Sequence, residues 1–227
     1  ATTIDIAGSV TATFNDAITA TTIALNGSSN LTISYTGAIT IAGNITDTST
    51  SNEINVLFAT ADTAPSLVTF SGAAVAADTI NIGSTTKAGK ATFSGSTGVT
   101  ATTLTIAGGD HENEDSTATF NDNLTATIVL DDNTGDAKII FATTNNATIT
   151  GTINGSATTE GTLQITGATK TFSGAIGTTE ALTLIDVDNA AIFDGSIEAT
   201  TLSVAASNYA LELNGAANVI TNAVTFN

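Results

Sequence analysis

Hydrophobic and polar residues alternate along most of the chain in short segments. In each segment two aliphatic residues stand two positions apart, usually with a threonine, asparagine or serine between them. Side chains at i and i+2 lie on the same face of a β-strand, so each pair is predicted to point into a core while the residue between them faces outward. The clearest pairs are Ile23/Leu25, Ile80/Ile82, Leu104/Ile106, Ile128/Leu130, Leu182/Leu184 and Leu202/Val204.

A phenylalanine precedes each aliphatic pair by 8 to 11 residues and opens a repeated unit, as in Thr92-Phe93-Ser94-Gly95. Several successive aromatic residues are 21 or 23 positions apart. Such a period suits one coil of a β-solenoid, in which short strands joined by turns stack on the previous coil about 4.8 Å away. The six openers are Phe14, Phe70, Phe93, Phe120, Phe172 and Phe193, and Tyr35, Phe58 and Phe141 are degenerate versions.

We therefore predict an all-β fold, a parallel β-helix-like solenoid with coils of roughly 21–23 residues, in which the aromatic openers form a ladder. Residues 1–227 read as a single repeat-built β domain without an internal boundary. Gaps of 27, 31 and 33 residues between aromatics are expected to hold loops that project outward, such as the polar segment 108–116. The alternative is one or two immunoglobulin-like β-sandwich domains, which would also show short alternating strands.

The two ends of the sequence read as halves of one unit. The first nine residues, ATTIDIAGS, resemble ATTLTIAGG at 101–109, but the aromatic opener that precedes the later copy is missing from the first. The last residues, from Val224 to Asn227, end in an opener, Thr-Phe-Asn. Either the residues are an excerpt from a longer repeat chain, or the terminal coil of one molecule is completed by the next molecule. The second reading predicts self-association through Ala1, Thr2, Thr3, Ile4, Ile6, Val224 and Phe226.

Composition excludes several classes of function. The chain has four lysines, no arginine and 21 acidic residues, which give a formal net charge of −17, so we expect no binding to nucleic acid. Its apolar runs are too short for membrane insertion as a helix. It has no cysteine, and its one histidine, His111, lies in a hydrophilic segment that we expect to be solvated. We therefore expect it not to be an enzyme.

Calcium is the ligand that the side chains favour most, because carboxylate and amide oxygens are abundant in tight turns. Two groups are candidates. The first comprises Asp131, Asp132 and Asp136, and the second comprises Asp186 and Asp188. Aspartate and asparagine are also ordinary turn residues, and neither group matches a known calcium-loop signature.

Six Asn-x-Ser/Thr sequons occur in the chain, so N-glycosylation is a further prediction that the sequence leaves open. Their asparagines are Asn26, Asn30, Asn44, Asn123, Asn146 and Asn154.

The recurring TFSG, TFND and ATTLTI units, together with the threonine-rich, cysteine-free and acidic composition, resemble prokaryotic S-layer proteins and autotransporter-type β-solenoid adhesins. This resemblance implies an extracellular, cell-surface location and a structural role, often with calcium. We expect a secreted protein that assembles head to tail with copies of itself into a surface layer or filament. The alternative is an adhesin passenger domain that binds a host receptor or glycan, and a glycan or the cell envelope is a further expected partner.

Overall fold

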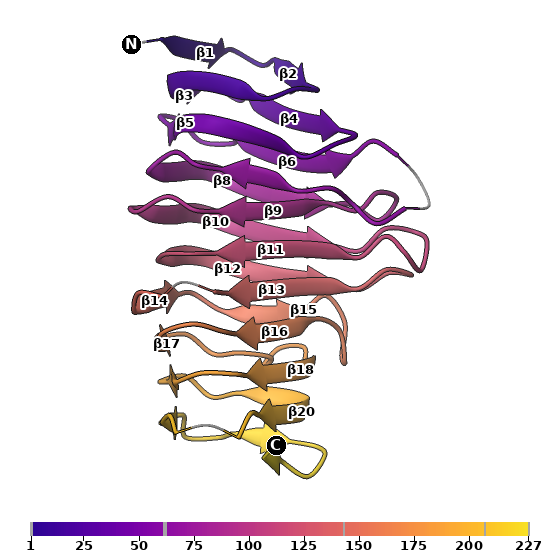
Figure 1. The fold of residues 1–227 in the computed structure, drawn as a ribbon, viewed down its shortest axis with the longest axis vertical. Coiled ribbons are helices and arrows are strands. Elements are labelled where there is room, and N and C mark those ends of the chain that lie inside the picture. Colours follow the sequence, from indigo (N-terminus) through magenta and orange to yellow (C-terminus); the bar gives the residue numbers. More distant parts are fainter. Residues whose placement is uncertain (1, 61–62, 143, 207, 227) are drawn as a thin grey trace.

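The computed structural model describes residues 2–60, 63–142, 144–206 and 208–226. Among these residues it contains strands and turns and no helix, and hence no helix that could span a membrane. The coils form one tall stack from the N-terminal end to the C-terminal end, as Figure 1 shows. The fold is a parallel β-solenoid of about nine coils, with equivalent residues roughly 23 positions apart, which confirms the predicted class.

All pairings between named strands are parallel. An immunoglobulin-like sandwich is built from antiparallel strands, so the alternative fold is wrong. The buried side chains form one hydrophobic cluster that extends from Ile6 to Val204.

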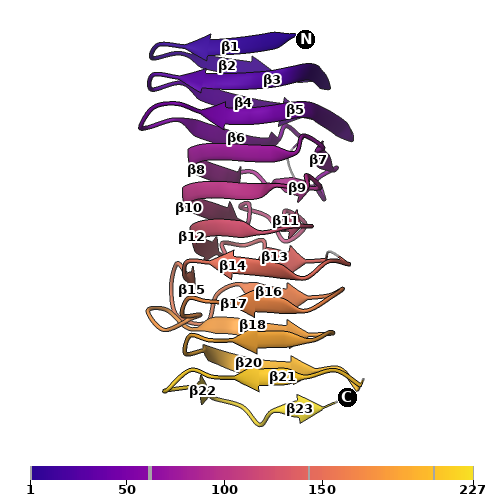
Figure 2. The same cartoon turned by 90° about the vertical axis from the view of Figure 1, so that its left-hand side faces the viewer.

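The chain visits three columns of paired strands in a fixed order, which we call A, B and C (Figures 1 and 2). In column A, Ile4 pairs with Ile23, Ile23 pairs with Ile45, and the series of register partners continues coil by coil to Leu213. Long strands turn a corner and belong to two columns, with β3 and β5 running from C into A, β8, β10 and β12 running from A into B, and β20 running from B into C.

The strands of each column follow from these pairings. Column A contains β1 (Thr3–Ala7), the second halves of β3 (Ile18–Asn26) and β5 (Ile39–Asp47), the first halves of β8 (Ala74–Gly83), β10 (Gly98–Ala107) and β12 (Leu124–Asp131), then β14 (Ala147–Thr150), β17 (Lys170–Phe172), β19 (Ala191–Phe193) and β21 (Leu211–Leu213). Column B contains β2 (Thr11–Phe14), β4 (Asn30–Tyr35), β6 (Glu53–Phe58), the second halves of β8, β10 and β12, β15 (Ile153–Gly155), single bridges at Ile176 and Ile197, and β22 (Val219–Ile220). Column C contains the first halves of β3 and β5, then β7 (Val68–Phe70), β9 (Lys90–Phe93), β11 (Ser116–Phe120), β13 (Ala137–Phe141), β16 (Thr162–Ile165), β18 (Leu182–Val187), β20 (Glu198–Val204) and β23 (Thr225–Phe226).

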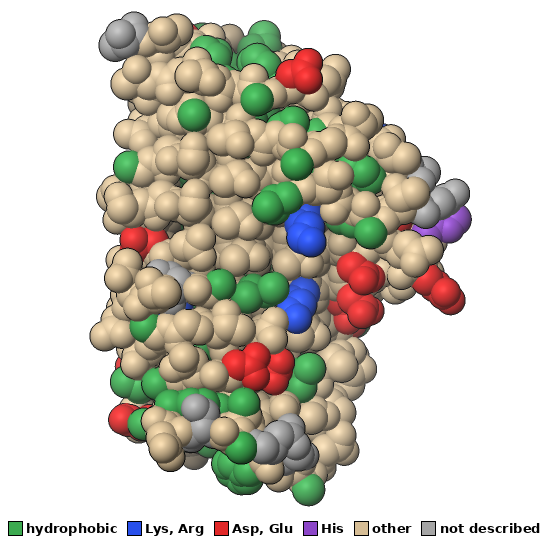
Figure 3. Space-filling view, viewed as in Figure 1, with side chains coloured by type: hydrophobic (Ala, Val, Ile, Leu, Met, Phe, Trp, Pro, Cys, Tyr) green, Lys and Arg blue, Asp and Glu red, His purple; other side chains and the backbone are tan. Residues whose placement is uncertain are grey.

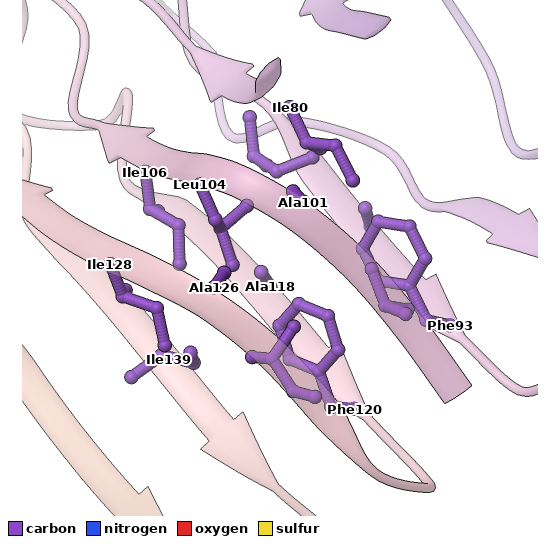
Figure 4. Close-up of a cluster of buried hydrophobic side chains, with 14 of the residues drawn as sticks. Ile80, Phe93, Ala101, Leu104, Ile106, Ala118, Phe120, Ala126, Ile128 and Ile139 are labelled. Carbon is purple, nitrogen blue, oxygen red and sulfur yellow. The ribbon is translucent and has the colours of Figure 1, made fainter. Parts of the chain in front are cut away.

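Five of the six aliphatic pairs point inward as predicted. The exception is Leu182/Leu184, because Leu184 is only half-buried, in an outward row, and Ile185 and Val187 take the inward positions. Leu104, Ile106 and Ile128 are fully buried, and Figure 4 shows them in layers with the rings of Phe93 and Phe120. Full burial of each such side chain contributes about 1.5–3 kcal/mol. Threonines occupy outward rows, for example Thr69 beside Thr92 and Thr92 beside Thr119.

The repeated sequence units do not keep to one column, which corrects the predicted single aromatic ladder. Tyr35 pairs with Phe58 in column B, Phe70, Phe93, Phe120 and Phe141 are neighbours in column C, and Phe172 pairs with Phe193 in column A. The near copies at 1–9 and 101–109 differ in the same way, because Ile4 lies in column A and Leu104 in column B. The three columns offer the same inward, strand-end environment, so one motif fits all of them.

This change of column explains the irregular spacing of the aromatic residues along the sequence. The 27-residue gap between Phe93 and Phe120 does hold a loop, 108–115, between β10 and β11. The 31-residue gap also holds an exposed loop, 156–161, between β15 and β16, but most of its length arises because Phe141 in column C and Phe172 in column A are separated by one coil and one further column. The loop expectation is also only partly right in detail, since Ser116 belongs to β11 and both Ser116 and Glu114 are buried.

Glycines in the opener motif mark a corner where consecutive coils approach closely. A Cβ atom on Gly174 would overlap the carbonyl oxygen of Gly151, and one on Gly195 would overlap that of Gly174. At these two positions the TFSG and IFDG openers therefore end in glycine, because no larger residue fits between the stacked backbones.

Candidate self-association surfaces

The two ends of the stack have strands that are paired on one side only. At one end, β1 pairs with β3 and β2 pairs with β4; at the other, β21 pairs with β19, and β22 and β23 pair with β20. We call β1, β2 and the start of β3 the head surface, and β21, β22 and β23 the tail surface. Each surface presents backbone N–H and C=O groups that a further parallel strand can pair with.

Exposed apolar side chains gather at the same two surfaces. Among the described residues, the large hydrophobic side chains that are exposed are Val10, Leu213, Val219, Val224 and Phe226. Phe226 is 75% exposed, whereas Val204, the residue it pairs with in the previous coil, is 5% exposed. In Figure 3 most of the visible face is polar, and hydrophobic atoms gather at its lower end, where the last coils lie.

The described residues predicted to mediate self-association lie on these surfaces or directly beside them, and Ile6 is the one that is buried. Thr2 and Thr3 are exposed, Ile4 is half-buried, and Val224 and Phe226 are exposed. Ile6 is 5% exposed and already belongs to the core, so it supports the head surface from below. Ala1 lies outside the described residues. Sequence analysis missed Leu213 and Val219, because the three-column path was needed to place them at the end.

Two aspartates of the first calcium candidate, Asp131 and Asp132, are hydrogen-bonded to the next coil. Asp132 accepts hydrogen bonds from the backbone N–H groups of Ala137 at 2.6 Å and Gly161 at 2.7 Å. Burial raises the pKa of Asp132, with smaller contributions from the charges of Asp136 and Glu160, while the two N–H donors act in the opposite direction. Asp131 accepts a hydrogen bond from the Ser156 hydroxyl at 2.7 Å.

The second candidate pair is bridged by an amide. The Gln164 Nε2 group donates to Asp186 Oδ2 at 3.1 Å and to Asp188 Oδ2 at 3.0 Å. Burial raises the pKa of Asp186, and the charge of Asp188 raises it further, while Lys138 lowers it. Among the residues that the structure describes, no group of three or more His, Cys, Asp or Glu side chains is arranged to hold a metal ion. Calcium binding by these residues stays a prediction.

The loop that carries His111 is partly exposed and partly anchored. The His111 ring is 3.9 Å from the Asp110 carboxylate, and both side chains are about half exposed. Glu114 is 1% exposed and accepts a hydrogen bond from the Asp110 N–H at 3.1 Å. Its buried carboxylate therefore holds the base of the loop against the solenoid.

Lys170 is a buried charge that sequence analysis did not single out. Its side chain is fully buried at the start of β17, and its ammonium donates to the backbone carbonyls of Asn145, at 3.2 Å, and Ala168. Burial lowers the pKa of the Lys170 ammonium to about 8. Nothing in the sequence Ala168-Thr169-Lys170-Thr171 distinguishes this lysine from an exposed one, except that it occupies an inward position of the strand alternation.

No family model, curated protein or solved structure matches this chain. The candidate surfaces therefore rest on geometry alone.

Proposed function

We propose that this protein is a non-enzymatic, extracellular structural protein whose molecules stack head to tail through parallel strand contacts into a filament or surface layer. The observation that carries the proposal is a match of apolar residues between the two end surfaces in all three columns. Stacking a second copy on the tail surface continues the order A, B, C that the chain follows throughout.

The internal register fixes which residues would meet. Continuing the pairings Phe193–Leu213, Ala199–Ile220 and Val204–Phe226 by one coil places the next copy's Ile4, Phe14 and Ile18 on these last positions. The three new contacts are then Leu213–Ile4, Ile220–Phe14 and Phe226–Ile18. Each joins two apolar side chains, and Phe226, the most exposed of them, loses most of its contact with water.

The polar residues beside these contacts are compatible with the same register. Asp5 of the second copy comes to lie next to Asn214, and Glu212 comes next to Thr3, so neither acid faces another acid in column A. Within the chain, the Asn214 amide already donates to Asp194 at 2.9 Å and the Asn26 amide donates to Asp5 at 2.5 Å. Amide-to-carboxylate bonds of this kind can therefore continue across the junction.

The composition and the type of fold support the proposed extracellular assembly. A repeat-built parallel β-solenoid is an architecture consistent with surface proteins such as S-layer and autotransporter-type proteins, and outward threonine rows leave its sides polar. The net charge of −17 keeps free molecules apart at low ionic strength, and cations reduce that repulsion. Assembly is therefore expected to be favoured by salt or calcium, with a glycan or the cell envelope as the anchoring partner.

A charge substitution at the tail surface tests association. Phe226→Asp should abolish head-to-tail polymers seen by negative-stain electron microscopy and sedimentation velocity, because a carboxylate would face the next copy's Ile18. The matched control is Thr125→Asp, which adds the same charge to an exposed position in the middle of the stack. Polymers formed equally by both variants would show that the tail surface is not used.

Cysteine cross-linking tests the register itself, since the chain has no cysteine of its own. Partners across a parallel junction fall within the Cα separation that a disulfide spans. The double variant Leu213→Cys, Ile4→Cys should give a ladder of disulfide-linked oligomers under mild oxidation. The control pair Thr125→Cys, Ile4→Cys should stay monomeric on a denaturing gel, and a ladder from the control alone would contradict the proposed junction.

A further inference from the structure

The chain contains three Asn-Gly sequences, which are Asn26-Gly27, Asn154-Gly155 and Asn214-Gly215. Glycine has no Cβ and adopts a wide range of backbone angles, so its nitrogen reaches the side-chain carbonyl carbon of a preceding asparagine more readily than that of other residues. Attack at this carbon expels ammonia, which is one reason why asparagine is a thermolabile residue. The fold decides which of the three sequences is able to react.

Asn26 is held by the coils on both sides of it. Its Nδ2 atom donates to Asp5 in the coil before at 2.5 Å, and its Oδ1 atom accepts from the Thr48 hydroxyl in the coil after. The residue is half-buried and belongs to β3, where it pairs with Ala7. Both polar atoms of the side chain are fixed, so its carbonyl carbon is kept from approaching the Gly27 nitrogen.

Asn154 is also enclosed between two coils. It lies in β15, which pairs with β12 in the coil before, and its Oδ1 atom accepts from the Thr179 N–H in the coil after at 3.1 Å. The attacking nitrogen is occupied as well, because the Gly155 N–H donates to the Glu180 carbonyl at 3.1 Å. Reaction at this sequence would break both of these contacts between coils.

Asn214 is exposed and has a coil on one side only. It follows β21 in the last coil (Figure 2), and its Nδ2 atom donates to Asp194 in the coil before at 2.9 Å. Among the residues that the structure describes, none donates to the Asn214 Oδ1 atom and none accepts a hydrogen bond from the Gly215 N–H. Of the three sequences, this one is restrained least.

The same side chain lies at the proposed junction between copies. There it has its own Asp194 on one side and the next copy's Asp5 on the other, so the Asn214 amide separates two carboxylates. A carboxylate at position 214 would place three acids in consecutive coils. Like charges that face each other on neighbouring strands are destabilising.

We propose that Asn214 is a site of spontaneous deamidation, and that its modification stops a molecule from accepting the next copy. The second part rests on the proposed head-to-tail stacking. The Gly215 nitrogen forms a bond to Asn214 Cγ, the Cγ–Nδ2 bond breaks, and ammonia leaves with the proton of the Gly215 N–H. Water then opens the resulting succinimide at either carbonyl and gives aspartate or isoaspartate. One water is consumed, one ammonia is released, and no oxidation or reduction takes place.

Stacking and modification oppose each other. A second copy that covers Asn214 gives it a coil on both sides, as Asn26 and Asn154 already have, and so restrains the reacting groups. Isoaspartate adds a methylene to the backbone directly after β21, which shifts the strand register that the next copy requires. Free molecules therefore lose the ability to stack as they age, whereas stacked molecules keep Asn214 intact.

Peptide mass spectrometry tests the site on free molecules. The folded protein is incubated at mildly alkaline pH and low ionic strength, shown to be monomeric by sedimentation velocity, and digested. The mass change from –NH₂ to –OH should accumulate several-fold faster at Asn214 than at Asn26 or Asn154, and in urea the three rates should become similar. Equal rates in the folded protein, or a faster rate at either of the other two, would overturn the proposed site.

Variants test the effect on stacking separately. Asn214→Asp should reduce head-to-tail polymers several-fold in negative-stain electron microscopy, whereas the control Thr125→Asp, with the same added charge in the middle of the stack, should not. Asn214→Gln keeps an amide that cyclises far less readily, so it should still stack after an incubation that disables the unsubstituted protein. Wild-type polymer levels in Asn214→Asp would overturn the effect on stacking.

The two failures are distinguishable. If the unsubstituted, unmodified protein forms no polymers, the proposed function and the effect on stacking are both wrong, and the rates measured on free molecules still decide the site. If polymers form, Asn214 within them should be modified several-fold more slowly than in free protein. Equal rates in polymers and in free protein would show that the next copy does not cover Asn214.

Discussion

Phe141 and Phe172 meet edge to face, with ring centroids 5.4 Å apart and planes inclined at 84°, although they belong to different columns. On either side of this pair the rings are stacked, with Phe120 next to Phe141 and Phe172 next to Phe193. The pair is therefore the point at which the aromatic stack crosses the corner from column C to column A.

The aromatic crossing should be energetically coupled. Phe141→Leu and Phe172→Leu should each lower the free energy of unfolding, and the double variant should lose less than the sum by about 0.5–1.5 kcal/mol, the range measured for aromatic pairs. Urea unfolding followed by circular dichroism measures this coupling. Strictly additive losses would mean that the two rings contribute only by filling volume.

The corner glycines should tolerate no side chain. Gly174→Ala is expected to lower the free energy of unfolding by about 1–3 kcal/mol, because its Cβ would overlap the carbonyl oxygen of Gly151 and force the coils apart. Gly37→Ala is the control, since a Cβ at Gly37 meets no atom within 4 Å. The two variants should therefore differ clearly in thermal melting temperature, and equal melting temperatures would refute the close approach.

Lys170 should make stability depend on pH above neutrality. Burial lowers its pKa from 10.5 to about 8, so between these values the unfolded chain binds more protons at this lysine than the folded one. The free energy of unfolding should therefore rise as pH increases from 8 towards 10. Burial raises the pKa of Tyr35 to about 12, which adds an opposite effect above pH 10, so the measurement should stop there.

The matching variants separate Lys170 from other groups that titrate in this range. Lys170→Met should remove the rise in stability between pH 8 and pH 10, and the exposed Lys90→Met should retain it. A rise of the same size in both variants would assign the effect to another group.

Salt should stabilise the folded protein, and calcium should be compared with sodium at equal ionic strength. Raising the ionic strength from about 0.01 M to about 0.15 M shortens the Debye length from about 30 Å to about 8 Å, which reduces repulsion among the acidic residues. Specific binding at Asp131, Asp132 and Asp136 or at Asp186 and Asp188 predicts a further rise in melting temperature with calcium. That rise should be reduced in Asp132→Asn or Asp186→Asn, and a calcium effect no larger than that of sodium would reject both sites.

The strands could be predicted from sequence because alternation is a local property. The spacing of Leu104 and Ile106 indicates an inward strand face whatever the surrounding sequence, and Gly95, two residues after Phe93, indicates a turn. The column of each strand could not be predicted, because Phe93 and Phe172 have nearly the same neighbours in sequence yet lie in columns C and A. Their placement depends on how many strands come before them.

The residues of the two end surfaces likewise divide into those that the sequence predicts and those that it does not. Phe226 and Ile4 were identified from the sequence because the opener motif is visibly split between the two ends. Leu213 and Ile220 were not, since their segments, Leu211–Leu213 and Val219–Ile220, carry no aromatic opener. Lys170 was missed for a related reason, because inward and outward positions cannot be told apart for a single polar residue in a three-residue strand.

The shift of the opener motif from one column to the next has a consequence for how such a chain can change length. Because strands on all three sides end in an aromatic opener, gain or loss of a segment one side long leaves every later residue in a suitable environment, merely rotated by one side. Growth by thirds of a turn is thus open to this architecture, and a lineage of such proteins can vary in height in small steps without rebuilding its interior.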